Sequence, residues 1–435
     1  MKISEKLVVG SATAAHQVEG NNINSDCWVM ENVEGSIWKE SSGTGVDHYN
    51  RYAEDIERMA KAGYKAYRFS IEWARIEPQK GVFDEKEIAH YREILLCCQE
   101  NDLIPVVTFH HFSSPIWLMN EGGWESEQLP DLFAAYAKKL TEELGELLPY
   151  VCTINEANMR LQIAKLMKNY ENPQVEENSQ TIQVGLSSDA EQFKQNYMDK
   201  LSEAFETNIE NIQPFISMAS PRGDALVMEA HMKARQAIKE VSPQTKVGLT
   251  LSLFDYQAID GGDVRCEEEW QDDFTHYLPA LEEDDFLGVQ NYTRKIIDKN
   301  GEVPLAADAK TTQPGYEFYP AALGHVVSKV AKDWHKPILI TENGVAVDND
   351  EDRVRFIKEA LAGLQTCIDA GVDVQMYLYW SLLDNFEWQA GYSQTFGMIA
   401  VNRETMERLP KESFYYLGSV SQHRSVEASW AKAIE

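Results

Sequence analysis

The chain has 435 residues, of which 70 are Asp or Glu and 40 are Lys or Arg, so its formal net charge at pH 7 is -30. A hydrophobic fraction of 43% and a charged fraction of 25% are ordinary for a globular protein and exclude collagen-like, coiled-coil and disordered chains. A charge this negative repels phosphate backbones and anionic lipid, so we expect neither a nucleic-acid partner nor binding to a membrane.

Eight short apolar runs predict β-strands, and several are apolar almost throughout, as expected of parallel strands covered on both faces. In chain order they are Leu7–Ala12, Ala66–Ser70, Pro105–Phe109, Val151–Asn155, Val247–Ser252, Phe286–Asn291, Pro337–Thr341 and Val374–Trp380.

Amphipathic stretches between these runs predict helices. They include Tyr49–Ala62, Phe133–Glu146, Ala225–Val241 and Asp352–Ala370. Gly63 follows the first of them, where a glycine commonly ends a helix in the left-handed conformation. The alternation of strands and helices predicts an α/β fold, a single (β/α)8 TIM barrel that spans residues 1–435 as one domain.

A doubly wound sheet is the main alternative to the barrel. Such a sheet usually carries a glycine-rich phosphate loop after its first strand, and residues 10–15 contain no GxGxxG pattern. The barrel is therefore favoured. From about residue 158 to 223 the chain is polar, with a helical pattern over Asp189–Phe205 but no clear strand. We interpret residues 158–223 as an elaborated excursion after the fourth strand.

The cellular compartment is predicted from what the sequence lacks. No apolar run approaches the ~18 residues that cross a bilayer, and residues 1–6 lack the apolar core of a secretory signal. Six cysteines are scattered through the chain without a CxxC pair or a Cys/His cluster of zinc spacing. We interpret them as free thiols and expect a cytoplasmic protein.

Catalytic groups of a barrel come from the C-terminal ends of its strands and from the loops that follow. Side chains suited to chemistry stand at these positions: Gln17, Arg68, His110, His111, Asn155, Glu156, Asn291, Tyr292, Glu342, Asn343 and Trp380. Glu156 and Glu342 each follow a buried strand, where a carboxylate has a high desolvation cost. Two such carboxylates are what glycoside hydrolysis requires, one as proton donor and one as nucleophile or base.

Simpler explanations exist for each residue taken alone. A single glutamate after a strand is more often a helix N-terminal residue that favours the dipole. His110 and His111 could be metal ligands, but no third ligand has a fitting spacing, so we expect no metal site.

Several motifs occur together in a fixed order along the chain. They are residues 10–20, 47–52 (with Asp47-His48-Tyr49 and Arg51-Tyr52), 66–73, 153–156 (Thr-Ile-Asn-Glu), 340–344 (Ile-Thr-Glu-Asn-Gly) and 380–388 (Trp-Ser-Leu-Leu-Asp-Asn-Phe-Glu-Trp). With these motifs the chain resembles glycoside hydrolase family 1, the β-glucosidase family, across nearly its whole length.

The resemblance implies a β-glycosidase that hydrolyses terminal non-reducing β-linked glucose-like sugars with retention, through a covalent glycosyl-enzyme. Glu342 would be the nucleophile and Glu156 the acid/base, and no cofactor or metal would be needed. The residues that support the nucleophile would be Arg68, Tyr292 and Asn291. The residues that bind the sugar would be Gln17, His111, Asn155, Glu387 and Trp388, with Trp380 stacking beneath the ring. We expect charge and hydrogen bonds to lower the pKa of Glu342, and burial beside another carboxylate to raise that of Glu156.

The chain also departs from the family pattern. Phe112 stands where the family usually has Trp, Ala157 where it has Pro, and Thr395 where a basic residue is usual. Residues 158–223 lack the usual landmarks, so the specificity for the leaving group does not carry over.

Two alternatives remain on the same fold. The first is a 6-phospho-β-glycosidase, against which Glu387 argues because a carboxylate would repel the phosphate. The second is a transglycosidase or a carbohydrate-binding protein. A binding protein should have lost Glu156 or Glu342, and both are present. In each case the partner is a small-molecule β-glycoside or oligosaccharide.

Overall fold

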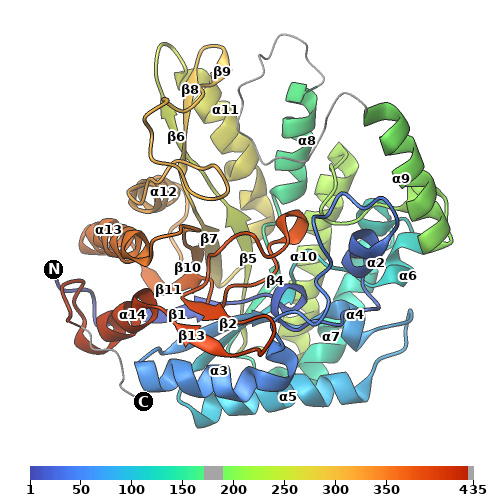
Figure 1. Cartoon of the computed structure of the whole chain (residues 1–435), viewed down its shortest axis with the longest axis horizontal. Helices are drawn as coiled ribbons and strands as arrows, with labels where there is room; N and C mark the ends of the chain where they lie inside the picture. The colour runs from blue at the N-terminus through green and yellow to red at the C-terminus, as the bar shows by residue number, and fades with distance from the viewer. Residues whose placement is uncertain (171–189, 430–435) are drawn as a thin grey trace.

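Eight parallel strands form a closed barrel at the centre of the protein, with helices around it (Figure 1). The computed structural model describes residues 1–170 and 190–429. Around the barrel the strand order is β1-β11-β10-β7-β5-β4-β3-β2. The strands are β1 (Val8–Ala12), β2 (Ala66–Ser70), β3 (Ile104–His110), β4 (Tyr150–Ile154), β5 (Lys246–Ser252), β7 (Phe286–Gln290), β10 (Ile338–Asn343) and β11 (Val374–Trp380). The predicted barrel and all eight predicted strands are confirmed.

The helices follow the strands as the alternating pattern predicts. They are α1 (Ala15–Val18), α2 (Asp26–Asn32), α3 (His48–Ala62), α4 (Trp73–Ile76), α5 (Glu85–Glu100), α6 (Ile116–Asn120), α7 (Leu129–Leu144), α8 (Met159–Tyr170), α9 (Ala190–Phe205), α10 (Pro221–Val241), α11 (Asp263–Asp273), α12 (Ala322–Val330), α13 (Asp350–Asp369) and α14 (Glu412–His423). Gly63 ends α3 at φ 98°, in the left-handed conformation expected there.

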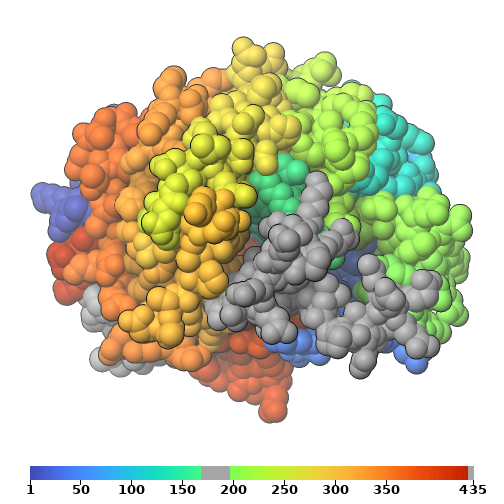
Figure 2. Space-filling view, turned by 90° about the horizontal axis from the view of Figure 1, so that it is seen from above, coloured from blue at the N-terminus to red at the C-terminus, as the bar shows by residue number. Residues whose placement is uncertain are grey.

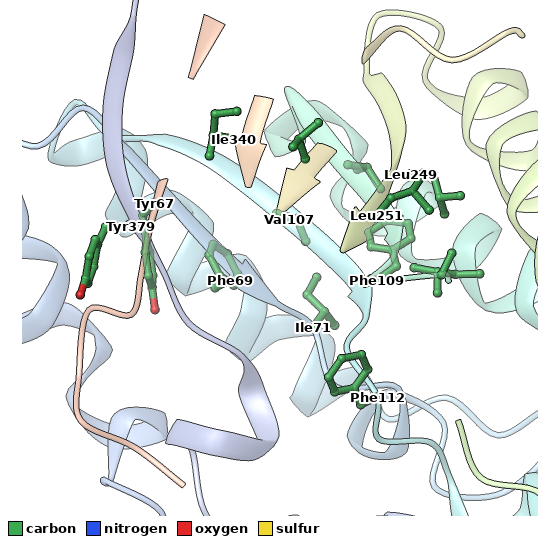
Figure 3. Close-up of a cluster of buried hydrophobic side chains, with 14 of the residues drawn as sticks. Tyr67, Phe69, Ile71, Val107, Phe109, Phe112, Leu249, Leu251, Ile340 and Tyr379 are labelled. Atoms are coloured by element: carbon green, nitrogen blue, oxygen red, sulfur yellow. The ribbon is translucent and has the colours of Figure 1, made fainter. Parts of the chain in front are cut away.

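Side chains alternate between the two faces of each barrel strand. Val107, Leu249 and Ile340 belong to the large apolar cluster between the strands and the surrounding helices (Figure 3). Val106 and Phe286 belong to a smaller cluster that fills the barrel interior. By the same alternation Arg68 and Gln290, toward the C-terminal ends of β2 and β7, also face inward. Glu342 does not follow this alternation, because the register of β10 shifts between Ile340 and Glu342.

Two small sheets were not predicted. The parallel pair β6 (Asp255–Ala258) and β8 (Arg294–Asp298), extended by β9 (Gly301–Glu302), packs against α11, on the face shown in Figure 2. The antiparallel pair β12 (Ile399–Val401) and β13 (Arg408–Pro410) precedes α14. These strands have two to five residues and are largely half-exposed, so they lack the apolar runs that identify the barrel strands.

The excursion predicted at 158–223 contains α8, α9 and the start of α10. The helical pattern predicted over Asp189–Phe205 is confirmed from Ala190 on by α9, and Asp189 lies outside the described residues. Residues 171–189 lie outside the described residues, so the interpretation of this stretch as an excursion within one domain stays a prediction. Among the described residues, no helix is both long and apolar enough to cross a membrane.

Candidate active site

Glu342 stands at the C-terminal end of β10 and is held on both carboxylate oxygens. The Arg68 guanidinium, from β2, donates to Oε1 at 2.6 Å, and the Tyr292 hydroxyl, after β7, donates to Oε2 at 2.5 Å. Glu342 is 3% exposed and Arg68 is fully buried, so water screens this ion pair little. One donor on each oxygen therefore fixes the orientation of the Glu342 carboxylate.

Glu156 follows β4 and is held through its backbone. Its φ is 46°, in the left-handed region, and its N–H donates to the Thr250 hydroxyl at 2.9 Å. The next N–H, of Ala157, donates to the Thr250 carbonyl at 3.0 Å. Glu156 is 5% exposed, and the described residues include no ion pair to its carboxylate. The two glutamates are therefore buried in very different surroundings.

These surroundings shift the two pKa values to different extents. Burial, and after it the negative charge of Glu342, raises the pKa of Glu156 well above its usual range. Burial also raises the pKa of Glu342, but the Arg68 charge and the Tyr292 hydroxyl oppose the rise. The expectation that these partners lower the pKa of Glu342 overall is thus wrong in net direction, because desolvation outweighs them. Glu342 still ionises before Glu156, since only Glu342 is paired with a cation.

Asn155 has its amide orientation fixed by donors on neighbouring strands. Its Oδ1 accepts from Arg68 at 2.6 Å and from Gln290 at 2.7 Å, with the Thr250 hydroxyl at 3.3 Å. Because donors surround Oδ1, the NH2 group must occupy the other position, where it lies 3.3 Å from Nε2 of His111. Arg68 therefore joins the predicted nucleophile to a predicted sugar-binding residue.

The other predicted sugar-binding residues gather around the β11 loop. The Gln17 amide donates to the Phe386 carbonyl at 2.8 Å and to Glu387 at 3.2 Å. Burial, and then the charge of Glu342, raises the pKa of Glu387 to about 8. The His111 ring is nearly parallel to Trp380, with centroids 5.6 Å apart, and to Trp388, at 6.2 Å. Burial and the neighbouring Arg68 lower the pKa of His111, so its imidazole is neutral.

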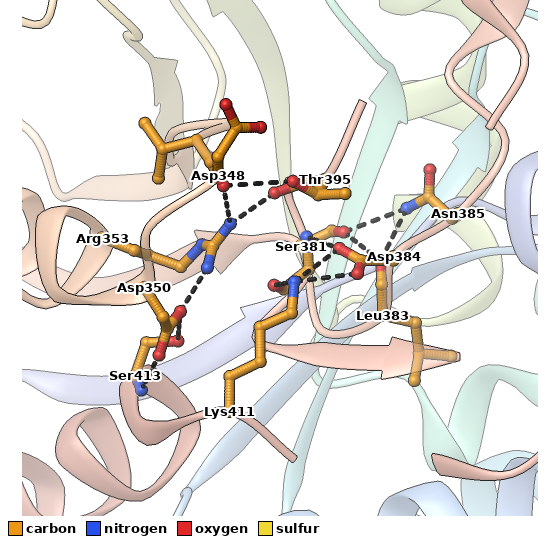
Figure 4. A network of polar contacts seen from close by, with 12 residues as sticks. Asp348, Asp350, Arg353, Ser381, Leu383, Asp384, Asn385, Thr395, Lys411 and Ser413 are labelled. Atoms are coloured by element: carbon orange, nitrogen blue, oxygen red, sulfur yellow. Dashed lines mark hydrogen bonds and ion pairs between the residues drawn. The ribbon is translucent and has the colours of Figure 1, made fainter. Parts of the chain in front are cut away.

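The loop that carries Glu387 is anchored by charged side chains that are buried or half-buried (Figure 4). Lys411 donates to both carboxylate oxygens of Asp384, at 2.9 and 2.8 Å, and to the Gly397 carbonyl at 2.7 Å. Arg353 donates to the carbonyl of Thr395, the position where a basic residue was expected. These contacts fix residues 381–397 against β13 and α13.

Asn291 lies apart from the group that it was predicted to support. Its side chain donates to the carbonyls of Leu253 and Thr293, both at 2.9 Å, and only its backbone N–H reaches the Glu342 carbonyl, at 3.3 Å. The residue before it, Gln290, takes the place in the barrel interior. Sequence reasoning missed Gln290 and Thr250, although strand alternation counted from Phe286 and Gly248 could have found both.

The predicted metal-free character and the cysteines can also be compared with the structure. Among the described residues, no three His, Cys, Asp or Glu side chains are grouped to hold a metal ion. His110 instead contacts the Ser114 hydroxyl at 3.1 Å, away from His111. All six cysteines are free, and all but Cys97 are buried.

Comparisons with known proteins identify the family of the chain. The family model described as glycosyl hydrolase family 1 matches residues 1–200 and 272–426. Beta-glucosidase A of Thermotoga maritima is 27% identical over 98% of this chain and 99% of its own length. A 6-phospho-beta-galactosidase of Staphylococcus haemolyticus is 26% identical over 98% of this chain and 100% of its own. The crystal structure of beta-glycosidase BGL167 superposes with a TM-score of 0.87 at 37% identity and covers 99% of both chains. The chain therefore belongs to glycosyl hydrolase family 1 and is a β-glycoside hydrolase.

Proposed function

We propose that this chain hydrolyses terminal β-linked glucose-like sugars with retention, using Glu342 as nucleophile and Glu156 as acid/base. One observation carries the proposal: two buried glutamates share the C-terminal end of the barrel, and only Glu342 is paired with a cation. An ionised carboxylate beside a carboxylic acid is the pair of protonation states that the first step of a retaining glycosidase requires.

The chemistry follows from these protonation states. In the first step, a Glu342 oxygen attacks the anomeric carbon while Glu156 gives its proton to the glycosidic oxygen, so the leaving group departs as an alcohol. In the second step, Glu156, now a carboxylate, takes a proton from water as the water oxygen attacks the same carbon. The ester to Glu342 breaks, and Glu342 is again ionised. Two inversions give net retention.

The sugar would be bound by the groups around this pair. The Asn155 NH2 group is fixed outward and would donate to the 2-hydroxyl, a contact that strengthens in the transition state. The Gln17 side-chain carbonyl oxygen, which has no hydrogen-bond partner among the described residues, and the Glu387 carboxyl would bind hydroxyls farther around the ring. Trp380 would supply the apolar face beneath the sugar.

The stereochemical outcome tests the proposal directly. Retaining enzymes hold their two carboxyl groups about 5–5.5 Å apart, whereas inverting enzymes leave room for a water between them. Proton NMR of an aryl β-glucoside digest should show the β-anomer of glucose first, followed by mutarotation. If the α-anomer forms first, the roles given to Glu342 and Glu156 are wrong.

A second candidate is hydrolysis of 6-phosphosugars, which the name of the Staphylococcus haemolyticus relative suggests. Glu387 argues against it. Its described partner is the Gln17 amide, so a phosphate of about -1.5 to -2 charge would meet a half-buried carboxyl with no cation beside it among the described residues. We expect kcat/KM to be higher for an aryl β-glucoside than for its 6-phosphate, and Glu387→Ser to narrow the difference. A preference of the unmodified enzyme for the phosphate would favour the second candidate.

We also propose that the enzyme acts in the cytoplasm. Six free cysteines support this location, because thiols remain reduced there, while proteins of oxidising compartments commonly form disulfides. Fractionation of the source cells with an antibody to this chain would test it.

A further inference from the structure

We propose that Thr250 is a positioning residue that fixes the acid/base glutamate through its side-chain hydroxyl. The inference rests on the proposed role of Glu156, and it adds a residue whose side chain need not touch the sugar. Thr250 lies in β5, is fully buried and, by strand alternation, faces the barrel interior.

The Thr250 hydroxyl meets two site residues at once. Its oxygen accepts the N–H of Glu156 at 2.9 Å, and it also lies 3.3 Å from the side-chain oxygen of Asn155. A hydroxyl can accept one hydrogen bond and donate another, so both contacts are compatible. The same residue also accepts, through its carbonyl, the N–H of Ala157 at 3.0 Å. A proline at position 157 could not make that bond.

The backbone conformation of Glu156 shows why such support is needed. At φ 46° the residue is left-handed, a conformation that residues with a Cβ rarely adopt because it brings that atom close to the following carbonyl oxygen. Such conformations persist only where surrounding contacts hold them, and they gather at functional sites. The hydrogen bond to Thr250 also satisfies a buried N–H that would otherwise be unpaired.

The segment after Glu156 is also hydrogen-bonded to β5. The Asn158 side chain accepts the Ser252 N–H at 3.0 Å and donates to the Ser252 carbonyl at 2.7 Å. Residues 156–158 therefore follow β5 through paired contacts. Of these contacts, the one from the Thr250 hydroxyl reaches the backbone N–H of Glu156 and can be removed by a side-chain substitution, so Thr250 is the position at which this support can be tested.

A misplaced acid/base affects some substrates more than others. Proton transfer requires the carboxyl to lie within hydrogen-bond reach of the leaving oxygen. Cleavage of alkyl glycosides depends on that proton, because an alkoxide is a poor leaving group. Cleavage of dinitrophenyl glycosides does not, because dinitrophenolate leaves as a stable anion. A purely structural role for Thr250 would lower activity equally for both classes.

Thr250→Val tests the proposal because it removes the hydroxyl and keeps the branched shape. We expect kcat/KM for methyl β-glucoside to fall at least about tenfold more than for 2,4-dinitrophenyl β-glucoside, within the range that general acid catalysis contributes. Thr250→Ser, which keeps the hydroxyl, should recover most of the activity toward methyl β-glucoside that Thr250→Val loses. If both substrates lose activity equally, the proposal is wrong. If Thr250→Val does not fold, Thr250→Ala is assayed in its place, with the same two outcomes.

Two reference variants separate this proposal from its alternatives. Thr245→Val removes a buried hydroxyl just before β5, at the opposite end of the barrel, where it donates to the Leu148 carbonyl at 2.8 Å. It should lower the melting temperature without discriminating between the substrates; discrimination by this variant would make the effect of Thr250→Val unspecific and overturn the inference. Glu156→Gln should discriminate most strongly. If Glu156→Gln discriminates and Thr250→Val does not, only the role of Thr250 is wrong; if Glu156→Gln does not, the acid/base assignment fails and the inference with it.

Discussion

The surroundings of Glu342 and Glu156 differ in the part of the residue that they hold. Around Glu342, Arg68 and Tyr292 donate hydrogen bonds to the two carboxylate oxygens, at 2.6 and 2.5 Å. Around Glu156, strand β5 hydrogen-bonds to the backbone, and no cation among the described residues pairs with the carboxyl group. The contacts around Glu342 stabilise its negative charge, whereas those around Glu156 fix its position.

This difference suits what each group does in a retaining reaction. The nucleophile must be ionised each time a substrate arrives, and a permanent cation favours that state. The acid/base must be protonated in the first step and ionised in the second, so a cation at bonding distance would hold it in one state. Fixing Glu156 through its backbone orients the carboxyl and leaves its proton exchangeable.

The largest expected effect comes from removing the nucleophile. Glu342→Ala should abolish nearly all hydrolysis of aryl β-glucosides, because no other group can form the glycosyl-enzyme ester. Adding azide should restore turnover and give an α-glucosyl azide, detectable by NMR, since the small anion fits where the carboxylate was removed. Glu387→Ala, which removes another glutamate near the site, should show no such rescue. Activity near that of the unmodified enzyme in Glu342→Ala would end the assignment.

Removing the proton of the acid/base should have a smaller effect that depends on the substrate. Glu156→Gln keeps the shape of the side chain but cannot donate, so kcat/KM for poor leaving groups should fall by about 10²–10⁴ and that for dinitrophenyl glycosides by much less. Hydrolysis needs Glu156 protonated, so activity of the unmodified enzyme should decline as pH rises through its raised pKa. That alkaline decline should disappear in the variant, and a decline that persists would assign it to another group.

The barrel could be predicted from the sequence because its physical cause lies in local composition. Strands buried on both faces must be apolar almost throughout, and the run Pro337–Thr341 has that character before Glu342 appears. The strands β6 and β8 face solvent on part of their surface and contain charged residues such as Arg294 and Lys295, so no pattern of that kind marks them.

Within the site, the sequence indicates residues whose chemistry is unusual for their place and misses residues whose chemistry is ordinary there. Arg68 and Glu342 stand out because charges at buried strand ends need partners. Thr250 does not, because a β-branched residue is ordinary in a strand. Asn291 and Gln290 are both amides, and a shift of one residue along β7 moves a side chain to the opposite face of the strand. Only the exact register of β7 in the structure shows which of the two amides faces the barrel interior.

The smallest expected effect comes from the hydroxyl that shares the nucleophile with Arg68. Tyr292→Phe removes one donor from Glu342 and leaves the ion pair in place. A hydrogen bond to a charged group contributes about 1.5–3 kcal/mol, so kcat/KM should fall about 10- to 100-fold, at roughly 1.4 kcal/mol for each factor of ten. The hydroxyl stabilises the ionised carboxylate and so opposes the rise in the pKa of Glu342. Without the hydroxyl, the pKa of Glu342 rises further, and the acidic limb of the pH profile should move to higher pH.

Tyr64→Phe is the matched control, because the buried Tyr64 hydroxyl donates to the Phe414 carbonyl at 2.8 Å, outside the site. It should change the melting temperature and not the pH profile. A Tyr292→Phe enzyme whose acidic limb does not move would show that Arg68 alone holds the charge of the nucleophile, and the comparison would then rest on one residue instead of two.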